Sequence, residues 1–248
     1  PQEIFFYRFL IAYLGIWVIS PKRLFTNNWQ DELWLVAGGI FGGSLYFFTE
    51  NTALGITQAS NVSFIICTAP LLTTILSLFF YKSEKASKGL IYGSLLALMG
   101  VGLIVFNGSF VLKISPIGDL LTLLAALSWA FYSLIIKKMA GRYPTIFITR
   151  KIFFYGVLTI LPAFLLHPLH PDTVVLLQPA VLFNLLFLAV LASLICYVLW
   201  NVVLKQLGTV RASNYIYLNP LFTMIASFLI LDEKITLVAL GGAACIAV

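Results

Sequence analysis

Charged side chains are scarce in this chain of 248 residues, because Asp, Glu, Lys and Arg make up only 10% of it. A soluble domain usually carries about 25% charged and about 45–50% apolar residues. Here the hydrophobic residues, Tyr and Trp included, reach 61%, and the mean hydropathy is +1.02. So few charges cannot cover a water-facing surface. The composition therefore excludes a soluble enzyme, a secreted disulfide scaffold and a disordered tail, and it predicts a protein of the bilayer.

Cysteine, histidine and catalytic motifs are also rare. Cys67, Cys196 and Cys245 lie in apolar stretches without metal-ligand spacing, which is typical of small core residues. His167 and His170 share one loop with a single Asp, too few ligands to predict a metal site. The chain has no nucleophile–base pair, HExxH or Walker motif, so we expect no enzyme, metal or cofactor. The net charge of +6 is spread between apolar runs, which disfavours nucleic acid as a partner.

Long apolar runs account for most of the sequence. A membrane helix needs about 20 mostly apolar residues, and continuous runs favour helices over transmembrane strands. We therefore expect an all-α polytopic membrane protein. The nine predicted spans lie near residues 3–19, 33–54, 59–80, 88–106, 117–136, 146–166, 180–204, 212–231 and 235–248. Because the chain starts without Met directly before a span and stops in an apolar run, we expect a further helix before Pro1 and a few residues after Val248.

The basic residues predict which connections face the cytoplasm. Connections alternate between the two sides, and the set that begins with residues 21–32 carries twelve Lys or Arg with its flanks, whereas the other set carries two. Such an asymmetry is a strong positive-inside signal. We expect the first visible span to run inward and, with a missing first helix, both termini of the full protein to be cytoplasmic.

The chain resembles itself at a shift of 150 residues. The matched pairs are Asn51 and Asn201, Ser63 and Ser213, Pro70 and Pro220, Leu71 and Leu221, Thr73 and Thr223, and Ser77 and Ser227. The two halves are offset by five spans, an odd number, so they insert in opposite directions. Inverted repeats are typical of secondary transporters, with the substrate site near the midplane. We predict a first repeat over residues 1–108 and a second over 109–248, and chance similarity is the alternative.

Pro70 and Pro220 lie in the middle of matching spans, where each removes an N–H donor from the helix. The small or polar residues that share their helix faces include Ser63, Cys67 and Thr74 in the first half and Tyr217 in the second. We expect these faces to line a cavity and the prolines to act as hinges. Tight packing of small residues is the alternative.

Glu50 is the most informative single residue, because it lies inside a span about one turn from its outer end, with Tyr46 before it and Asn51 after it. An ionised carboxylate in hydrocarbon costs roughly 2.5–3.5 kcal/mol on insertion scales, so it should face protein or water. Arg8, also inside a span near the outer side, is its candidate partner. Two interpretations stay open: a fixed Glu50–Arg8 pair, and a proton- or substrate-binding carboxylate.

Aromatic residues with polar tips accompany these positions. Asn201, with Tyr197 one turn before it, occupies the matching region of the second half, and Trp129 and Tyr132 add further aromatic surface. Aromatic walls with a few hydrogen-bonding groups suit a small amphipathic ligand. Ordinary core packing is the alternative for each of them.

These motifs together carry a family resemblance. In the first half they are Glu50-Asn51-Thr52-Ala53-Leu54-Gly55, Ala59-Ser60-Asn61-Val62-Ser63, Ala69-Pro70-Leu71 and Glu84, and in the second Leu127-Ser128-Trp129-Ala130, Leu207-Gly208, Ala212-Ser213, Asn219-Pro220-Leu221 and Asp232-Glu233. With them the chain resembles the EamA-like permeases of the drug/metabolite transporter superfamily along its whole visible length.

The resemblance implies a ten-helix bundle of two inverted five-helix repeats, with nine spans visible, a central cavity and alternating access in a bacterial inner membrane. It also implies small metabolites as substrates, often amino acids and usually exported. We expect the substrate and membrane lipid as partners and allow for proton coupling and a homodimer.

Two alternatives remain. A nucleotide-sugar or sugar-phosphate exchanger is weaker, because only Arg8 is a deep cation, with Arg150 and Lys151 near an inner end. A membrane scaffold or sensor is weaker, because the connections are barely a dozen residues long.

Overall fold

The computed structural model describes residues 2–21, 25–26, 28–81, 88–106, 115–166, 169, 176–231 and 236–247. Over these residues the regular secondary structure is helical. In lipid every backbone polar group needs a partner, and a helix supplies those partners within one segment. The expectation of an all-α protein is confirmed for this part of the chain.

Several of the helices are long and apolar enough to cross a membrane, as expected of a polytopic membrane protein. Among the described residues, five meet that condition: Gln2–Ile19, Ala59–Phe80, Pro116–Ala140, Thr145–Leu165 and Pro179–Leu207. Shorter apolar helices cover Ile91–Phe106 and Leu237–Ile246. The number of nine visible spans stays a prediction.

The chain divides into two compact units, and each unit takes segments from both halves of the sequence. Unit 1 contains residues 1–48 and 131–208, and unit 2 contains residues 49–130 and 209–248. Two of the boundaries fall inside helices, α3 (Leu45–Ile56) and α7 (Pro116–Ala140). The predicted repeat boundary near residue 108 stays a prediction.

The third boundary follows Gly208, which ends the helix before it. Gly208 has a φ of 79° and donates its N–H to the carbonyl of Leu204 at 3.1 Å. A glycine accepts this left-handed conformation without the steric cost that a side chain would add.

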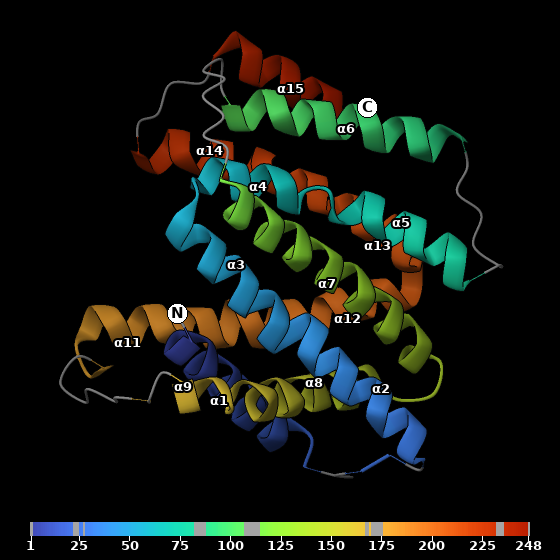
Figure 1. Ribbon diagram of the computed structural model, residues 1–248, viewed down its shortest axis with the longest axis vertical. Helices are drawn as coiled ribbons and strands as arrows, with labels where there is room; N and C mark the ends of the chain where they lie inside the picture. The colour runs from blue at the N-terminus through green and yellow to red at the C-terminus, as the bar shows by residue number, and fades with distance from the viewer. Residues whose placement is uncertain are drawn as a thin grey trace. The chain divides into compact units, whose positions relative to one another are not determined.

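Unit 1 is built from long helices, and two of these helices each contain one π-helical segment. Its elements are α1 (Gln2–Ile19), α2 (Trp29–Gly39), the π segment η1 (Ile40–Ser44), the start of α3, the end of α7, α8 (Thr145–Ile160), α9 (Ala163–Leu166), α11 (Pro179–Leu186), the π segment η2 (Phe187–Ile195) and α12 (Cys196–Leu207). Helix α1 packs against α8 and η2, and Figure 1 shows α1 beside α8.

The core of unit 1 is aromatic. Phe9 of α1 is fully buried, and the rings of Phe5, Phe47, Phe153 and Tyr197 surround it with centroid distances of 4.3–5.7 Å. Tilted and edge-to-face pairs at this spacing are favourable beyond the area they bury. One side chain therefore holds together four helical segments of this unit.

Glycines allow α2 and η1 to approach their neighbours closely. A Cβ at Gly39 would lie 2.9 Å from the backbone nitrogen of Gly156 on α8, and a Cβ at Gly42 would lie 2.2 Å from the ring of Tyr132. Small residues at membrane helix crossings let backbones come together. The sequence around residues 38–43 has this packing role.

Unit 2 contains the broken helices that carry the two prolines. Its elements are the end of α3, α4 (Ala59–Ile66), α5 (Ala69–Phe80), α6 (Lys88–Phe106), the start of α7, α13 (Thr209–Asn214), the 3₁₀ segment η3 (Tyr215–Leu218), α14 (Asn219–Leu231) and α15 (Leu237–Ala247). Helices α6 and α15 lie side by side (Figure 1).

Two glycines form the crossing of α6 and α15. A Cβ on Gly100 would lie 2.5 Å from the carbonyl oxygen of Gly242, and a Cβ on Gly242 would lie 2.5 Å from that of Gly100. The contact is thus reciprocal. Beside it, Cys67, Ala97 and Tyr217 belong to the buried core of the unit.

The prolines follow helix breaks and do not kink a continuous helix. Pro70 and Pro220 are each the second residue of a helix, α5 and α14, where the missing N–H removes no intrahelical bond. Residue Ile216, four positions before Pro220, has its carbonyl satisfied by the N–H of Asn219. The local 3₁₀ turn therefore gives the Ile216 carbonyl the hydrogen bond that Pro220, which has no N–H, cannot donate.

Candidate functional site

Three fully buried polar side chains form a hydrogen-bonded chain across three helices of unit 1. The hydroxyl of Tyr132 on α7 donates to Oδ1 of Asn201 on α12 at 2.8 Å, and Nδ2 of Asn201 donates to Oγ1 of Thr149 on α8 at 2.9 Å. All three residues are 0% exposed. An amide has both an acceptor and donors, so Asn201 can connect the two hydroxyl groups. The structure thus brings together two predicted site residues, Tyr132 and Asn201.

Tyr197 extends this cluster toward the π segment η1. Its hydroxyl donates to the carbonyl oxygen of Gly42 at 2.5 Å, and its ring lies 5.9 Å from that of Tyr132 and 5.4 Å from that of Phe153. π-helical turns are rare and often occur at functional sites. Tyr132, Tyr197 and Asn201 together form a buried cluster in unit 1 whose hydroxyl and amide groups are hydrogen-bonded to protein groups.

Arg8 places a cation in the apolar helix α1. Its Nε donates to Oγ of Ser193 in η2 at 2.9 Å, and its Cζ lies 4.5 Å from the centre of the Phe47 ring. Charges inside membrane helices are expensive and are held by polar or aromatic partners. Arg8 is therefore oriented by groups of two neighbouring segments.

A buried ion pair lies where α2 begins. Lys151 of α8 is 3% exposed and pairs with Glu32, which also accepts hydrogen bonds from the hydroxyl of Tyr155 and from the N–H and hydroxyl of Thr26. Glu32 lies just before the expected span 33–54. Burial raises its pKa, but the hydrogen bonds from Lys151, Tyr155 and Thr26 together outweigh burial and lower the pKa to about 2. Glu32 is therefore a stable anion at neutral pH.

The neighbouring basic residues are engaged by protein groups as well. Arg142 pairs with Asp31, which also accepts a hydrogen bond from the hydroxyl of Tyr143 at 3.0 Å. Arg150, 2% exposed, donates to the carbonyl of Ser20. These contacts give the cations structural roles, so they add no support for a sugar-phosphate exchanger.

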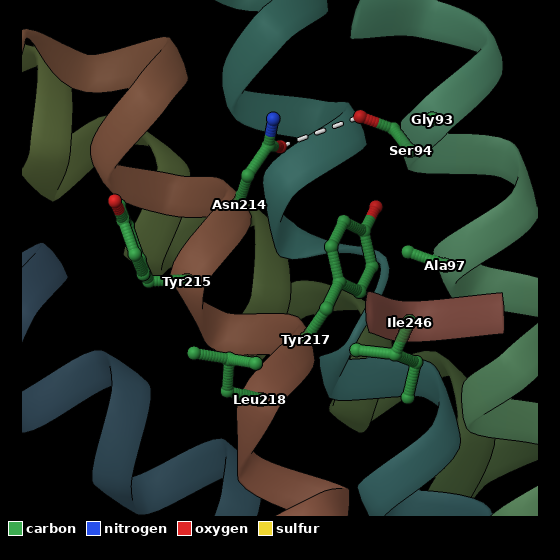
Figure 2. Close-up of a pocket in the computed structure, with 8 residues that line it drawn as sticks. All are labelled: Gly93, Ser94, Ala97, Asn214, Tyr215, Tyr217, Leu218 and Ile246. Atoms are coloured by element: carbon green, nitrogen blue, oxygen red, sulfur yellow. Dashed lines mark hydrogen bonds between the residues drawn. The ribbon is translucent and has the colours of Figure 1, made fainter. Parts of the chain in front are cut away.

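Unit 2 contains a pocket of about 270 Å³ between α6, the α13–η3 segment and α15 (Figure 2). Tyr217, a predicted site residue, lines it and is 2% exposed. The hydroxyl of Ser94 donates to Oδ1 of Asn214 at 3.3 Å. Tyr217 therefore shares a pocket with residues of α6 and α15, and the sequence does not predict that these helices lie beside it.

The predicted residues of α4 and α5 do not form one uniform polar face. Ser63 is exposed, whereas Cys67 is buried in the core that includes Tyr217. Thr74 is buried, and its hydroxyl donates to the carbonyl of Pro70 at 2.9 Å within the same helix.

Glu50 and Asn51 are partly buried in the part of α3 that belongs to unit 2, whereas Arg8 belongs to unit 1. The Glu50–Arg8 pair therefore stays a prediction. Trp129, on α7, and Tyr46, on α3, are also partly buried. The loop histidines at 167 and 170 lie outside the described residues.

Comparison with known proteins decides the family. The EamA-like transporter family matches residues 1–106 and 116–248. The chain belongs to the EamA-like transporter family. It is therefore a membrane transporter, as the resemblance in its sequence predicts, and the family points away from an enzyme.

Relatives agree with this assignment. The EamA-like chain is 31% identical over 253 residues to an uncharacterized transporter of Archaeoglobus fulgidus, covering 100% of this chain and 86% of the relative. It is 22% identical over 243 residues to a probable amino-acid metabolite efflux pump of Escherichia coli, covering 96% of this chain and 79% of the relative. A solved crystal structure superposes with a TM-score of 0.80 at 18% identity, covering 100% of this chain and 84% of the other, a likeness that shows the fold alone.

Three residues that the structure connects to others, Thr149, Glu32 and Tyr155, do not stand out in the sequence of this EamA-like chain. Thr149 accepts the hydrogen bond from Asn201, and Glu32 pairs with Lys151 and accepts a hydrogen bond from Tyr155. The sequence contains one sign of this cluster: Lys151 and Tyr155 are four residues apart, so they share a helix face. Which acidic residue meets that face depends on the packing of α2 against α8.

Proposed function

We propose that this EamA-like chain is a secondary transporter, a permease or exporter, that moves small metabolites across the bacterial inner membrane by alternating access. Amino acids are the favoured substrates, because a relative carries the name of an amino-acid metabolite efflux pump. Inverted repeats would supply the two halves that exchange positions.

The observation that carries the proposal is that the helix irregularities occur in pairs 150 residues apart. Residues 40–44 form η1, and residues 190–194 lie inside η2. The break between α4 and α5 includes residues 67–68, and η3 includes residues 217–218. The same spacing relates Pro70 to Pro220 in the sequence. Chance similarity between apolar helices gives no reason for irregular backbone to recur at the same spacing, so the pairing supports two related repeats.

The substrate would meet the aromatic and amide groups of unit 1. Tyr132, Tyr197 and Asn201 combine aromatic rings with hydrogen-bonding groups that are bonded to protein here, so the substrate would reach them in another state of the transport cycle. Arg8 adds a positive charge complementary to the carboxylate of an amino acid, and Glu50 is our candidate for proton coupling.

The test is uptake of a pooled, labelled amino-acid mixture into proteoliposomes that contain the full-length protein, with and without an imposed pH gradient. Accumulation that depends on the gradient supports an amino-acid/proton exchanger, and Glu50→Gln should then abolish the dependence. Equilibration that ignores the gradient keeps amino acids but assigns Glu50 a structural role. No uptake into sealed vesicles would contradict amino acids as substrates, and phosphorylated sugars would then be tested.

The hinge role predicts that Pro70→Ala and Pro220→Ala each slow transport several-fold with little change in thermal stability. A proline in the first turn of a helix costs no hydrogen bond, so alanine there is tolerated. Alanine would, however, allow the helix to continue through the break and would stiffen it. Initial uptake rates and thermal midpoints measure the two effects.

Pro179→Ala is the matched control, because Pro179 also starts a helix, α11, but does not follow such a break inside a span. It should transport at the wild-type rate. Wild-type rates in both Pro70→Ala and Pro220→Ala would contradict the hinges.

A further inference from the structure

The pocket of unit 2 has apolar walls and an open mouth. Ala97 of α6, Leu218 of η3 and Ile246 of α15 line it. Gly93, also in its lining, is exposed, and a Cβ built there would meet nothing within 4 Å. An apolar cavity of about 150 Å³ is large enough to bind benzene, so a pocket of about 270 Å³ can hold a longer apolar group.

A buried hydroxyl group points into this pocket without a well-formed hydrogen bond. The hydroxyl of Tyr217 lies near Ser94 and interacts weakly with it (Figure 2), but Ser94 donates to Asn214, and no described residue makes a hydrogen bond of normal geometry with Tyr217. Leaving a buried polar group unpaired is unfavourable. A ligand that offers a hydrogen-bond acceptor to Tyr217 would remove this cost.

The lining determines what kind of acceptor fits. Every residue described along the pocket is uncharged, so a carboxylate or phosphate inside it would be desolvated without a countercharge. A neutral carbonyl avoids that cost. The side-chain amide of Asn214, also in the lining, provides a second polar group at the same end of the pocket.

The helices that line the pocket also carry exposed apolar residues and one exposed cation. On α6, Tyr92 and Met99 are 70% and 62% exposed. Arg211 is exposed on α13, three residues before Asn214. Arg211 also belongs to the basic set expected at the cytoplasmic side, where anionic headgroups lie.

We propose that this pocket binds one phospholipid of the cytoplasmic leaflet through an acyl ester. The ester carbonyl accepts a hydrogen bond from Tyr217, the acyl chain lies along Ala97 and Ile246, and the phosphate lies toward Arg211. The site uses residues of unit 2 alone and does not depend on the identity of the transported substrate.

Photolabelling of the full-length protein in lipid nanodiscs tests the site. The probe is a phosphatidylcholine with a diazirine in its ester-linked acyl chain, and the labelled peptides are mapped by mass spectrometry. Labelling should concentrate on the peptides of α6, η3 and α15, at least threefold above other exposed helices. Gly93→Leu, which fills the mouth, should lower it at least threefold, and Arg211→Gln about threefold.

Gly241→Leu is the matched control, because Gly241 is also a helix-interior glycine whose Cβ would meet nothing within 4 Å, and it does not line the pocket. It should label like the wild type. Labelling in Gly93→Leu equal to that in the wild type would overturn the proposal.

An ether-linked probe tests the role of Tyr217 separately from folding. It lacks the ester carbonyl, so the wild type should label about fivefold less with it than with the ester. In Tyr217→Phe the two probes should label equally. Equal labelling in the wild type, or displacement of the ester probe by the transported amino acids, would overturn the lipid assignment.

Discussion

Asn201 connects two helices through a single side-chain amide, because its oxygen accepts from Tyr132 and its nitrogen donates to Thr149. Asn201→Leu would remove the amide oxygen to which the buried hydroxyl of Tyr132 donates, at a cost of about 1–3 kcal/mol. We expect a lower thermal midpoint in detergent. Tyr132→Phe should cost less when it is added to Asn201→Leu than when it is made in the wild type, because this hydrogen bond is already absent. Strictly additive losses would contradict the coupling.

Glu32 predicts a pH dependence of stability. Its pKa in the folded protein is about 2, below the value of roughly 4.3 expected in an unfolded chain. The stabilisation is therefore complete above about pH 4.3 and is lost as the pH falls toward 2. Glu32→Gln should flatten the profile of thermal midpoint against pH in this window.

The same variant should be less stable at neutral pH, because it leaves Lys151 buried without its countercharge. Glu32→Gln combined with Lys151→Met, which removes both charges, should recover part of that loss. If the double variant is less stable than Glu32→Gln alone, the ion pair does not have this role.

The sequence singles out residues one position at a time and does not indicate which helices meet. Tyr132 and Asn201 stand out in the sequence because polar groups are rare in apolar spans, and the structure joins them by a hydrogen bond. Thr149 does not stand out, because a threonine in a membrane helix can satisfy itself by bonding back to its own helix, as Thr149 also does to the carbonyl of Thr145 at 2.9 Å. Its contact with Asn201 depends on how α8 packs against α12.

At the scale of helices, the glycine crossing of α6 and α15 should be sensitive to one methyl group. Gly100→Ala would place its Cβ against the carbonyl oxygen of Gly242, and overpacking of this kind costs about 1–3 kcal/mol. Gly241 precedes Gly242 in α15, and a Cβ there would meet nothing within 4 Å. Gly241→Ala should therefore be tolerated. Thermal midpoints in detergent compare the two, and equal midpoints would contradict the close crossing.

The sequence predicts the positions at which helices are interrupted better than it predicts the backbone conformation of each interruption. Pro70 and Pro220 mark the positions, but the structure interrupts each helix just before the proline, with a turn in one case and a 3₁₀ segment in the other. The π segments η1 and η2 have no residue signature, because they differ from an α-helix only in which carbonyl each N–H reaches.

At the scale of the whole molecule, the compact units and the predicted repeats divide the chain differently. Each unit takes segments from both halves of the sequence. The residue matches at a shift of 150 follow the chain linearly, so they suggest two repeats but do not indicate which non-adjacent segments pack together.

The charge asymmetry predicts a membrane orientation that labelling can check. In a variant with the three cysteines replaced by Ala, Gln58→Cys should react with a membrane-impermeant maleimide from outside the cell. Gly141→Cys should react only after the membrane is permeabilised, because its connection belongs to the basic set. Both positions are exposed. Labelling of both from the same side would contradict the orientation.

The π segment in the helix over residues 29–56 also has a consequence for how such a transporter can change during evolution. A π turn closes its hydrogen bonds over one residue more than an α turn. Loss of one codon within residues 40–44 would therefore restore the α-helix and leave the later positions of that helix facing nearly the same neighbours. In a regular α-helix, with 3.6 residues per turn, the same loss would rotate them by about 100°. The π segment is thus the place where this helix tolerates the loss of one residue without turning Glu50 and Asn51 away from their neighbours.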